Sequence, residues 1–334
     1  MFFTLAITLV LQAAPKAPAP TTLFTDKSPL VNMIASLPGD TIFAQTWSSV
    51  TAFKRKDGSE LWKSGRIVLE IQEGPVPKKA DFAKRLPAPM LAASSKHLFV
   101  GTNTMLPSFQ SYDLETGEKG TSQGGTDFKK HATCMLTNKN GTYVYFGIEN
   151  IGVSRMGVGN VDDWSRRGTD NGGVTCFALD KKEKVIAMGG SDGSVRYINF
   201  TSASLDKKKH HKTGMGPISA IRFAKKGKSV LVGNEKGEVQ VLNTSKGKQL
   251  LTLEGPNSAV RWIRVQAKNK WAVVGYANGK LRFFELKKGT QLLELEHPEA
   301  KLGIVGLALG DKDQTLLSAG GKTVLSWDLG GHLK

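Results

Sequence analysis

Residues 233–255 have the sequence GNEKGEVQVLNTSKGKQLLTLEG, and residues 275–297 have the sequence GYANGKLRFFELKKGTQLLELEH. The two stretches align without a gap at a spacing of 42 residues, and nine positions are identical. In each copy an apolar run follows a turn that contains glycine, and a second apolar run follows a turn that contains lysine. Short apolar runs between such turns are typical of antiparallel β-strands. The pair therefore indicates one structural unit that is repeated along the chain.

The same unit recurs before and after this pair. Clear copies begin at Gly173, Pro217, Ser258 and Leu302, and each contains three strand-like runs. In the first copy, Asp192-Gly193 fits a tight type I′ turn between the second and third runs. The third run of every copy ends in an apolar residue and a following residue that is usually polar. These pairs stand at Phe53-Lys54, Tyr112-Asp113, Met156-Gly157, Ile198-Asn199, Leu242-Asn243, Phe284-Glu285 and Trp327-Asp328.

The spacing of these seven pairs predicts the fold. The first step, from Phe53 to Tyr112, is 59 residues, and each later step is 42 to 44 residues. A period of about 40–45 residues with several short strands is typical of a β-propeller. One such unit cannot bury both of its faces alone, so neighbouring units stack radially. The sequence therefore predicts an all-β, seven-bladed β-propeller.

The chain resembles the WD-repeat β-propeller family from about Thr21 to its end. The segments that carry the resemblance are SDGSVRYIN, NEKGEVQVLN, NGKLRFFE and TVLSWDL with its Trp327-Asp328. Where that family has a Gly-His pair before the first strand, this chain has Gly216-Pro217, Gly255-Pro256 and His297-Pro298. The first unit, DTIFAQTWSSVTAFKRKDGSELWK, resembles quinoprotein-type propeller repeats equally well. The resemblance implies a non-catalytic platform for protein–protein interaction.

Two segments lie outside the regular repeat. The last unit has only three strand-like runs, whereas TTLFTD at residues 21–26 is a strand-like segment without a partner. In WD-repeat propellers the N-terminal strand completes the last blade, and the resemblance implies the same closure here. The long first step predicts a loop at about residues 63–89. Such a loop is either functional or a solvated connection.

The first residues, MFFTLAITLVLQAAPKAPAP, form a separate block. The apolar run from Phe2 to Leu11 is shorter than the about 20 residues that span a bilayer, and it has the size of a signal-peptide core. We expect a signal peptide at 1–14, a Pro/Ala linker at 15–20 and the propeller at 21–334. This organisation predicts an exported, periplasmic or secreted monomer without a stable membrane span. A cytoplasmic location is the alternative, because no Lys or Arg precedes the apolar run.

Common catalytic and metal-binding motifs are absent from the sequence. It contains no Gly-x-Ser-x-Gly, P-loop, His-Glu-x-x-His or Cys-x-x-Cys pattern. His210-His211 would point to opposite faces of a strand, and Asp162-Asp163 fits a solvated turn better than an acid–base pair or a Ca²⁺ site. The chain also lacks the adjacent cysteines of some quinoprotein dehydrogenases. We therefore expect no cofactor and no enzyme activity.

The alternative is a propeller enzyme with a site in the central channel, as in quinoprotein or lyase propellers. Such a site needs polar side chains that converge from several innermost strands. The predicted innermost strands are mostly apolar, and Arg222, Arg261 and Arg264 are the few exceptions. Cys134 and Cys176 lie 42 residues apart at one repeat position, which Ala220, Trp262 and Gly306 occupy in later copies. They are either small apolar fillers near the hub or a disulfide pair.

The chain has a formal net charge of +17, with 46 basic and 29 acidic residues. Lysine is concentrated in the turns between the first and second strands and between the third and fourth strands, and 54–56 (KRK) fills such a turn in the first unit. In an antiparallel blade both turns emerge on one rim, so one face is predicted to be basic. The candidate interaction face comprises Lys181, Lys182, Lys184, Lys225, Lys226, Lys228, Lys246, Lys248, Lys268, Lys270, Lys287 and Lys288.

This basic face has two interpretations. It is either a docking surface for an acidic protein or another polyanion, or a set of solubilising turn residues. No aromatic residues alternate with the basic turns, so base stacking on nucleic acid is not supported. KKKHHK at residues 207–212 is expected on an outer strand, where charge protects a sheet edge from pairing.

Overall fold

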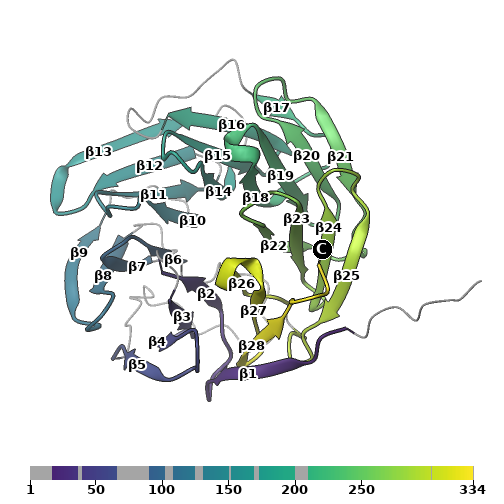
Figure 1. The fold of residues 1–334 in the computed structure, drawn as a ribbon. Helices are drawn as coiled ribbons and strands as arrows, with labels where there is room; N and C mark the ends of the chain where they lie inside the picture. Colours follow the sequence, from purple (N-terminus) through teal and green to yellow (C-terminus); the bar gives the residue numbers. More distant parts are fainter. Residues whose placement is uncertain are drawn as a thin grey trace, which may run out of the picture.

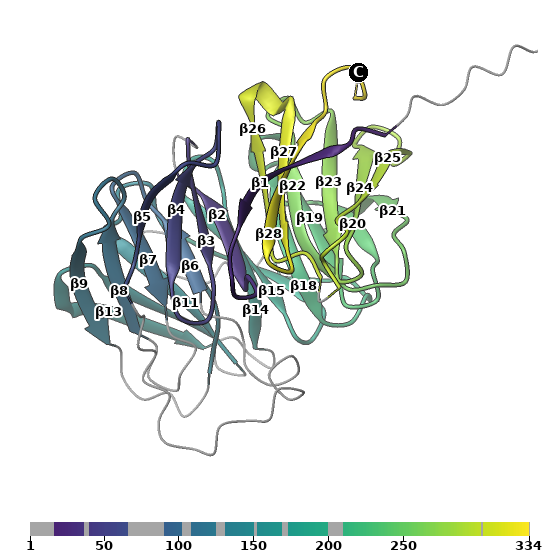
Figure 2. The same ribbon diagram turned by 90° about the horizontal axis from the view of Figure 1, so that it is seen from below.

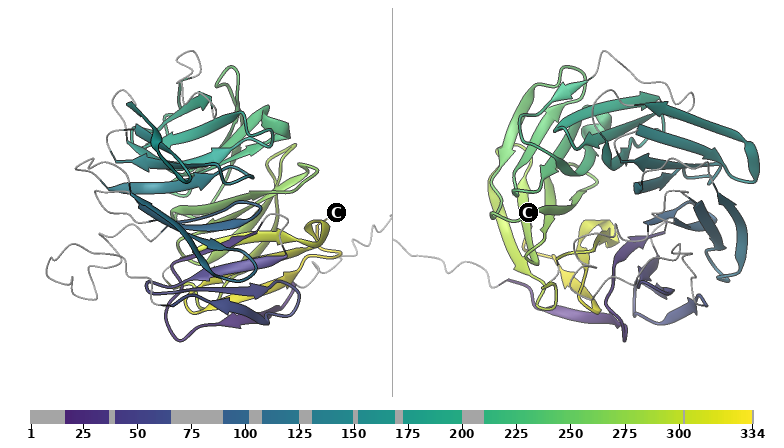
Figure 3. Two further views of the ribbon diagram at one scale, coloured as in Figure 1. Left: turned by 90° about the vertical axis from the view of Figure 1, so that its left-hand side faces the viewer. Right: turned by 180° about the vertical axis from the view of Figure 1, so that it is seen from behind.

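The structure is a computed structural model of the chain and describes residues 17–36, 40–65, 90–101, 108–124, 131–149, 152–168, 173–199, 210–301 and 303–333. These residues form seven four-stranded antiparallel sheets. The sheets are arranged around one axis as the blades of a propeller (Figure 1). Seen from the side, the blades form a single layer whose strands run between two rims (Figures 2 and 3). The predicted all-β, seven-bladed β-propeller is confirmed.

Blades 1–6 follow the chain order, and the first strand of each lies nearest the axis (Figure 1). Blades 1–3 contain β2 (Asn32–Ala35), β3 (Thr41–Gln45), β4 (Val50–Lys54), β5 (Glu60–Lys63); β6 (Met90–Ala93), β7 (His97–Gly101), β8 (Ser108–Asp113), β9 (Lys119–Gly124); β10 (Ala132–Thr137), β11 (Tyr143–Ile148), β12 (Gly152–Gly157) and β13 (Asn160–Gly168). Blades 4–6 contain β14 (Val174–Leu179), β15 (Val185–Gly190), β16 (Ser194–Asn199), β17 (His211–Lys212); β18 (Ile218–Ala224), β19 (Ser229–Asn234), β20 (Val239–Asn243), β21 (Gln249–Leu253); β22 (Val260–Val265), β23 (Trp271–Tyr276), β24 (Lys280–Glu285) and β25 (Gln291–Glu296).

Blade 7 is built from both ends of the described chain. Its inner strands are β26 (Gly306–Gly310), β27 (Thr315–Gly320) and β28 (Thr323–Asp328), and its outer strand is β1 (Pro20–Thr25). β1 runs antiparallel to β28, with Thr21 opposite Ser326 and Thr25 opposite Thr323. The predicted closure is therefore present, and the strand begins at Pro20, which we had placed in the linker.

Each pair that set the repeat lies at the end of the third strand of its blade, from Phe53-Lys54 in β4 to Trp327-Asp328 in β28. The apolar member is buried in every case, and Phe53 and Ile198 are fully covered. It packs between neighbouring blades, where it closes one edge of an apolar cluster. The pattern is thus a requirement of blade packing, which explains why it persists while other positions vary.

The second strand of a blade is covered on both faces by its neighbours. All residues of β19 and of β23 are buried, and the sequences SVLVGN and WAVVGY are nearly continuous apolar runs rather than alternating ones. Continuous short runs are expected for strands that are buried on both faces. The innermost strands are further joined by hydroxyl groups that donate to main-chain carbonyl groups of the next blade: Thr133 to Val174, Thr175 to Ile218 and Ser219 to Val260.

The hairpin between β15 and β16 differs from the predicted type I′ turn. A type I′ turn needs positive φ at both central residues, but only Gly193 has it, at 74°. The Gly193 N–H donates to the carbonyl group of Gly190 at 3.1 Å, so the loop has three residues and ends in glycine. Gly237 and Gly279 take the same place in blades 5 and 6, with φ of 92° and 83°. A Cβ atom on Gly237 would lie 2.1 Å from a carbonyl oxygen, so packing as well as φ requires glycine there.

Other sequence predictions need correction or lie outside the described residues. Asp162-Asp163 belongs to β13 instead of a turn, because the third-to-fourth-strand turn of blade 3 closes earlier, at residues 158–159. The innermost strand of blade 1 is β2, which the sequence had left unassigned.

Three predicted segments lie outside the described residues: the signal peptide at 1–14, residues 66–89 of the long loop and residues 207–209. In the part of the chain that is described, no helix has the length and apolar character needed to cross a membrane.

Candidate functional site

The two kinds of lysine-bearing turn lie on the same rim of the propeller. In blade 5 the N–H of Thr244, in the turn after the third strand, donates to the carbonyl group of Lys228, in the turn after the first strand, at 3.1 Å. In blade 6 the N–H of Leu286 donates to the carbonyl group of Lys270 at 2.8 Å. The turns therefore touch within each blade, as the antiparallel connectivity predicted.

Turns of neighbouring blades are also joined on this rim. In each case a main-chain N–H of one blade donates to a side-chain oxygen of the next: Lys139 to Glu183 at 2.6 Å, Lys225 to Asn269 at 2.6 Å and Ala267 to Asp313 at 2.9 Å. These bonds link the turns after the first strands of blades 3 and 4 and those of blades 5, 6 and 7. The backbone that carries the lysines of blade 6 is therefore held from both neighbouring turns, and that of blade 5 is held from one.

We call the twelve lysines of the candidate interaction face the lysine arc, because they all lie on the rim of blades 4, 5 and 6. Every one of these side chains is exposed. Within the described part of the chain, none forms an ion pair with a carboxylate. Three acidic residues, Asp180, Glu183 and Glu285, lie in the same turns. Asp180 accepts main-chain hydrogen bonds of its own turn, which occupies its carboxylate locally.

The rest of this rim is less basic than the sequence suggested. In blade 2 the corresponding turn contains Asp113, Glu115 and Glu118, and in blade 7 it contains Asp313 and Asp328. Exposed lysines also stand on this rim outside these blades, namely Lys54 and Lys56 in blade 1, Lys96 in blade 2, Lys139 in blade 3 and Lys312 in blade 7. The predicted basic face is therefore densest over blades 4, 5 and 6, where twelve exposed lysines stand beside only three acidic residues.

Three basic side chains near the opposite rim are paired. Arg196 binds the carboxylate of Asp192 at 2.5 Å in blade 4. Lys280 and Arg282 both bind Glu294 in blade 6, at 2.7 and 2.6 Å. In the described ranges, none of the twelve lysines of the arc is paired in this way.

A cavity of about 420 Å³ lies within the lysine arc, between blades 4 and 5. Lys226 and Lys228 line it together with the rings of Tyr197 and Phe223. The hydroxyl groups of Tyr197 and Thr244 are buried there. Burial raises the pKa of the Tyr197 phenol, so this group stays protonated and is available as a donor. The sequence did not indicate this cavity, because Tyr197 occupies a third-strand position that only packing distinguishes from the other apolar residues.

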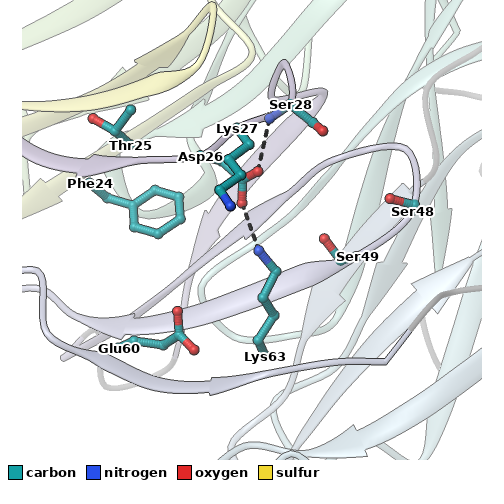
Figure 4. A pocket seen from close by; sticks show the side chains of 9 residues that line it. All are labelled: Phe24, Thr25, Asp26, Lys27, Ser28, Ser48, Ser49, Glu60 and Lys63. Atoms are coloured by element: carbon teal, nitrogen blue, oxygen red, sulfur yellow. Dashed lines mark hydrogen bonds and ion pairs between the residues drawn. The ribbon is translucent and has the colours of Figure 1, made fainter.

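A larger cavity of about 760 Å³ lies beside the strand that closes the ring (Figure 4). It is lined by the segment from Phe24 to Ser28, by Ser48 and Ser49, and by Glu60 and Lys63. Burial acts to raise the pKa of Asp26, but hydrogen bonds from the Ser28 N–H and the Lys63 ammonium group outweigh it, and the net pKa is lowered. No histidine among the described residues lines the cavity, and the Lys63 ammonium group is engaged by the Asp26 carboxylate at 3.0 Å. The cavity is therefore best described as part of the contact between β1 and blade 1.

Cys134 and Cys176 are both free thiols and lie on the innermost strands β10 and β14. They pair with Gly147 and Gly189, and Trp262 pairs with Gly275 at the matching place in blade 6. The equivalence that the sequence predicted is thus confirmed. Burial raises the pKa of the Cys176 thiol to about 12 and raises that of Cys134 even further. Neither thiol is poised as a nucleophile at neutral pH.

We expect both thiols to react slowly in the folded protein. The thiolate is the reactive form, and a pKa raised to about 12 leaves very little thiolate at pH 8 for Cys176. Titration with a thiol reagent should therefore give two thiols in denaturant without reductant, and reaction slower by roughly 1000-fold or more in native buffer. A single class of fast-reacting thiols in the native protein would contradict this environment, and a count of zero in denaturant would show a disulfide.

The arginines that the sequence placed on innermost strands are found there. Arg222 lies on β18, and Arg261 and Arg264 lie on β22. The guanidinium group of Arg264 lies over the ring of Trp262, 4.8 Å from its centroid. Arg222 and Arg264 stand close to the turns that carry the lysine arc, whereas Arg261 lies toward the opposite end of β22.

Blade 7 and the segment that leads into it contain buried polar side chains. The indole N–H of Trp327 donates to the hydroxyl group of Ser318 at 2.8 Å, and both residues are buried. His297 is also buried, and its two ring nitrogens make no hydrogen bond. Burial lowers the pKa of His297, so its ring is neutral at pH 7. The described residues contain no group of three His, Cys, Asp or Glu side chains that could hold a metal ion.

The histidines proposed to lie on an outer strand do so in part. His211 begins β17, and its ring lies edge-on to Tyr197 with centroids 5.8 Å apart, whereas His210 is exposed just before the strand.

Comparison with known proteins finds no relative of this chain: no protein-family model matches it, and no curated protein is similar to it in sequence. The geometry of the propeller therefore carries the functional argument.

Proposed function

We propose that this protein is a non-catalytic, WD-repeat-like propeller that acts as a protein-interaction platform, and that the lysine arc binds an acidic surface of its partner. The observation that carries the proposal is the concentration of twelve exposed, unpaired lysines on the rim of three consecutive blades. An uncompensated field of this kind attracts an oppositely charged surface and guides its approach. A rigid propeller presents such a surface without reorganisation.

Two features of blade 7 support the WD-repeat part of the proposal. The blade ends in Trp327-Asp328, and Trp327 is buried. His297, which stands near the place of that family's Gly-His pair, is buried in the segment that leads from β25 to β26. The other blades carry the packing pattern without these residues, which is consistent with a degenerate repeat.

A protein partner is favoured over nucleic acid by the residues of the arc. Tyr197 and Phe223, the aromatic rings at the arc cavity, lie between blades rather than on the surface, so they offer no platform for stacked bases. Binding of a general polyanion through the same arc is the second candidate function, because lysine also neutralises phosphate and sulfate groups. A site for enzyme chemistry has weaker support, since the two cavities described above lack an activated nucleophile or a metal-binding cluster.

The proposal is tested by reversing charge on and off the arc. We expect Lys226→Glu, Lys228→Glu and Lys246→Glu together to weaken binding of a polyglutamate peptide by about 10–100-fold at low salt, because each reversal replaces an attraction by a repulsion. The matched control is the triple variant Lys236→Glu, Lys301→Glu and Lys322→Glu, which changes net charge equally with exposed lysines from the opposite rim. Fluorescence anisotropy of a labelled peptide measures both.

The outcomes separate the candidate functions. Equal weakening in the two triple variants would show that only net charge matters, and the arc would be rejected as a site. Binding of heparin or duplex DNA that is tighter than peptide binding, and is lost with the arc, would assign the arc to polyanions instead of an acidic protein. The peptide and the polyanion measurements are each repeated over a series of salt concentrations, because purely electrostatic affinity falls steeply with ionic strength.

A further inference from the structure

Arg222 and Arg264 occupy the same position on the innermost strands of neighbouring blades. Arg222 pairs with Leu231, the third residue of β19, and Arg264 pairs with Val273, the third residue of β23. The strands are held together directly, because the Ser219 hydroxyl group on β18 donates to the Val260 carbonyl group on β22 at 2.7 Å. The two guanidinium groups are therefore neighbours near the axis, at the strand ends that lead into the lysine arc.

The other five blades place apolar residues at this position. The pairing registers identify them as Ile34, Ala92, Leu136, Ala178 and Ala308. A charged side chain is consequently not required for the fold of an innermost strand. Two arginines in adjacent blades are a departure from the repeat, and sites in repeat proteins lie where the repeats differ.

Neither guanidinium group has a carboxylate partner among the described residues. Arg264 donates to the carbonyl group of Ile263 at 3.1 Å and stacks on Trp262, which leaves most of its N–H groups free. Arg222 is exposed and has no hydrogen bond that competes for its donors. Burial lowers the pKa of Arg264, and the nearby charge of Arg222 lowers it further. Arginine nonetheless stays charged at neutral pH, so two like charges lie near one another without a carboxylate in the described ranges that compensates them.

We propose that Arg222 and Arg264 form a binding site for a single oxyanion group, a carboxylate or a phosphate, held between the two guanidinium groups and beside the Trp262 indole. Planar guanidinium groups bind both oxyanions through paired hydrogen bonds. A bound anion also removes the repulsion between the two guanidinium groups. This gain adds to the free energy of the hydrogen bonds that the anion accepts. The indole shields one side of Arg264 and keeps its guanidinium plane in a fixed orientation.

Inorganic phosphate is the first probe. It is added to the full chain, and sodium chloride is lowered to keep the ionic strength constant; a second series with sodium chloride alone serves as the reference. We expect a saturable rise in the thermal unfolding midpoint of the wild-type protein, because an anion bound only to the folded state stabilises it. Arg222→Gln and Arg264→Gln should each weaken the apparent affinity for phosphate by about tenfold or more. Without phosphate, neither variant should unfold at a lower temperature than wild type, since each removes a repulsion. This last readout shows that a lost response does not come from a damaged fold.

Arg261→Gln is the matched control, because Arg261 is an exposed arginine on the same strand toward its other end. Its variant should keep the full response to phosphate. An unchanged response in both Arg222→Gln and Arg264→Gln, or an equal midpoint rise with chloride alone, would overturn the site. A loss of response in Arg261→Gln equal to that in the other variants would also overturn it.

Competition identifies the source of the oxyanion. Displacement of phosphate by a short Glu-containing peptide, but not by its Gln counterpart, assigns the site to an acidic side chain of a macromolecule; phosphate binding without such competition assigns it to a small free anion. The site does not depend on the proposed docking function. The Lys226, Lys228 and Lys246 triple variant should lose polyglutamate binding and retain its response to phosphate, so failure of one proposal is distinguishable from failure of the other.

Discussion

A chain that begins at Ser28 is expected to unfold far more readily than a chain that begins at Ala17, because the shorter chain lacks β1. The loss removes the main-chain hydrogen bonds of β1 to β28 and the burial of Leu23 and Phe24. Together these contributions predict a decrease of about 3–6 kcal/mol in the free energy of unfolding. Two chains that share every other residue isolate the effect of this one strand.

β1 also connects blade 7 with blade 1. The ring of Phe24 stacks on that of Phe53 in β4, with centroids 4.7 Å apart and planes nearly parallel. Asp26 binds Lys63 of β5 at 3.0 Å, and the Asp26 N–H donates to the Lys322 carbonyl group at 2.9 Å. Removing β1 therefore exposes an edge of blade 7 and loosens the seam between the first and last blades, so the whole ring is affected.

Urea unfolding followed by far-ultraviolet circular dichroism measures the difference. Phe24→Ala should give a smaller decrease, of about 1–3 kcal/mol, because the ring is only partly buried. Lys63→Ala is the control for the exposed ion pair and should change stability by at most about 1 kcal/mol. A chain beginning at Ser28 with an unchanged unfolding midpoint would show that β1 does not close the ring.

The repeat made the architecture predictable from sequence. The seven terminal pairs stand at positions that packing between blades constrains, so they persist at a nearly constant spacing. TTLFTD could be assigned to blade 7 because that blade lacked a fourth strand. The innermost strand β2 was missed because it has only four residues, NMIA, which is too short a run to be distinguished from the connection between two longer strands. The type I′ turn was wrong because Asp192-Gly193 is compatible with both a two-residue and a three-residue loop, and only the strand register distinguishes them.

The candidate sites were less predictable than the blades. The connectivity of the antiparallel sheet placed the lysine arc on one rim, but the acidic residues that lower the positive charge elsewhere on this rim come from turns of blades 2 and 7 with no sequence relation to the arc. The cavity between blades 4 and 5 depends on how two blades pack, as does the isolation of His297 from hydrogen-bond partners. Arg222 and Arg264 were visible as exceptions on apolar strands. Their equivalence became clear only from the pairing register.

Replacing Trp327 by alanine is expected to lower the free energy of unfolding by about 3–5 kcal/mol, which is the usual effect of removing a buried indole. Only 2% of this side chain is exposed, and it packs in the apolar cluster between blades 6 and 7. Trp327→Phe should cost less, about 1–2 kcal/mol, because most of the apolar contact remains while the Ser318 hydroxyl group loses its donor. The two substitutions thus separate packing from the hydrogen bond.

A double-mutant cycle with Ser318→Ala tests this separation. Once Ser318 is alanine, no buried hydroxyl group is left without a partner, so Trp327→Phe should be less destabilising than it is in the wild-type background. Leu292→Ala, at a side chain that is 42% exposed on the outer strand of blade 6, serves as the control and should stay within about 0.5 kcal/mol of wild type. A Trp327→Ala variant as stable as this control would mean that the terminal Trp-Asp pair does not anchor blade 7. An additive cycle would mean that the 2.8 Å contact between Trp327 and Ser318 contributes no net stability.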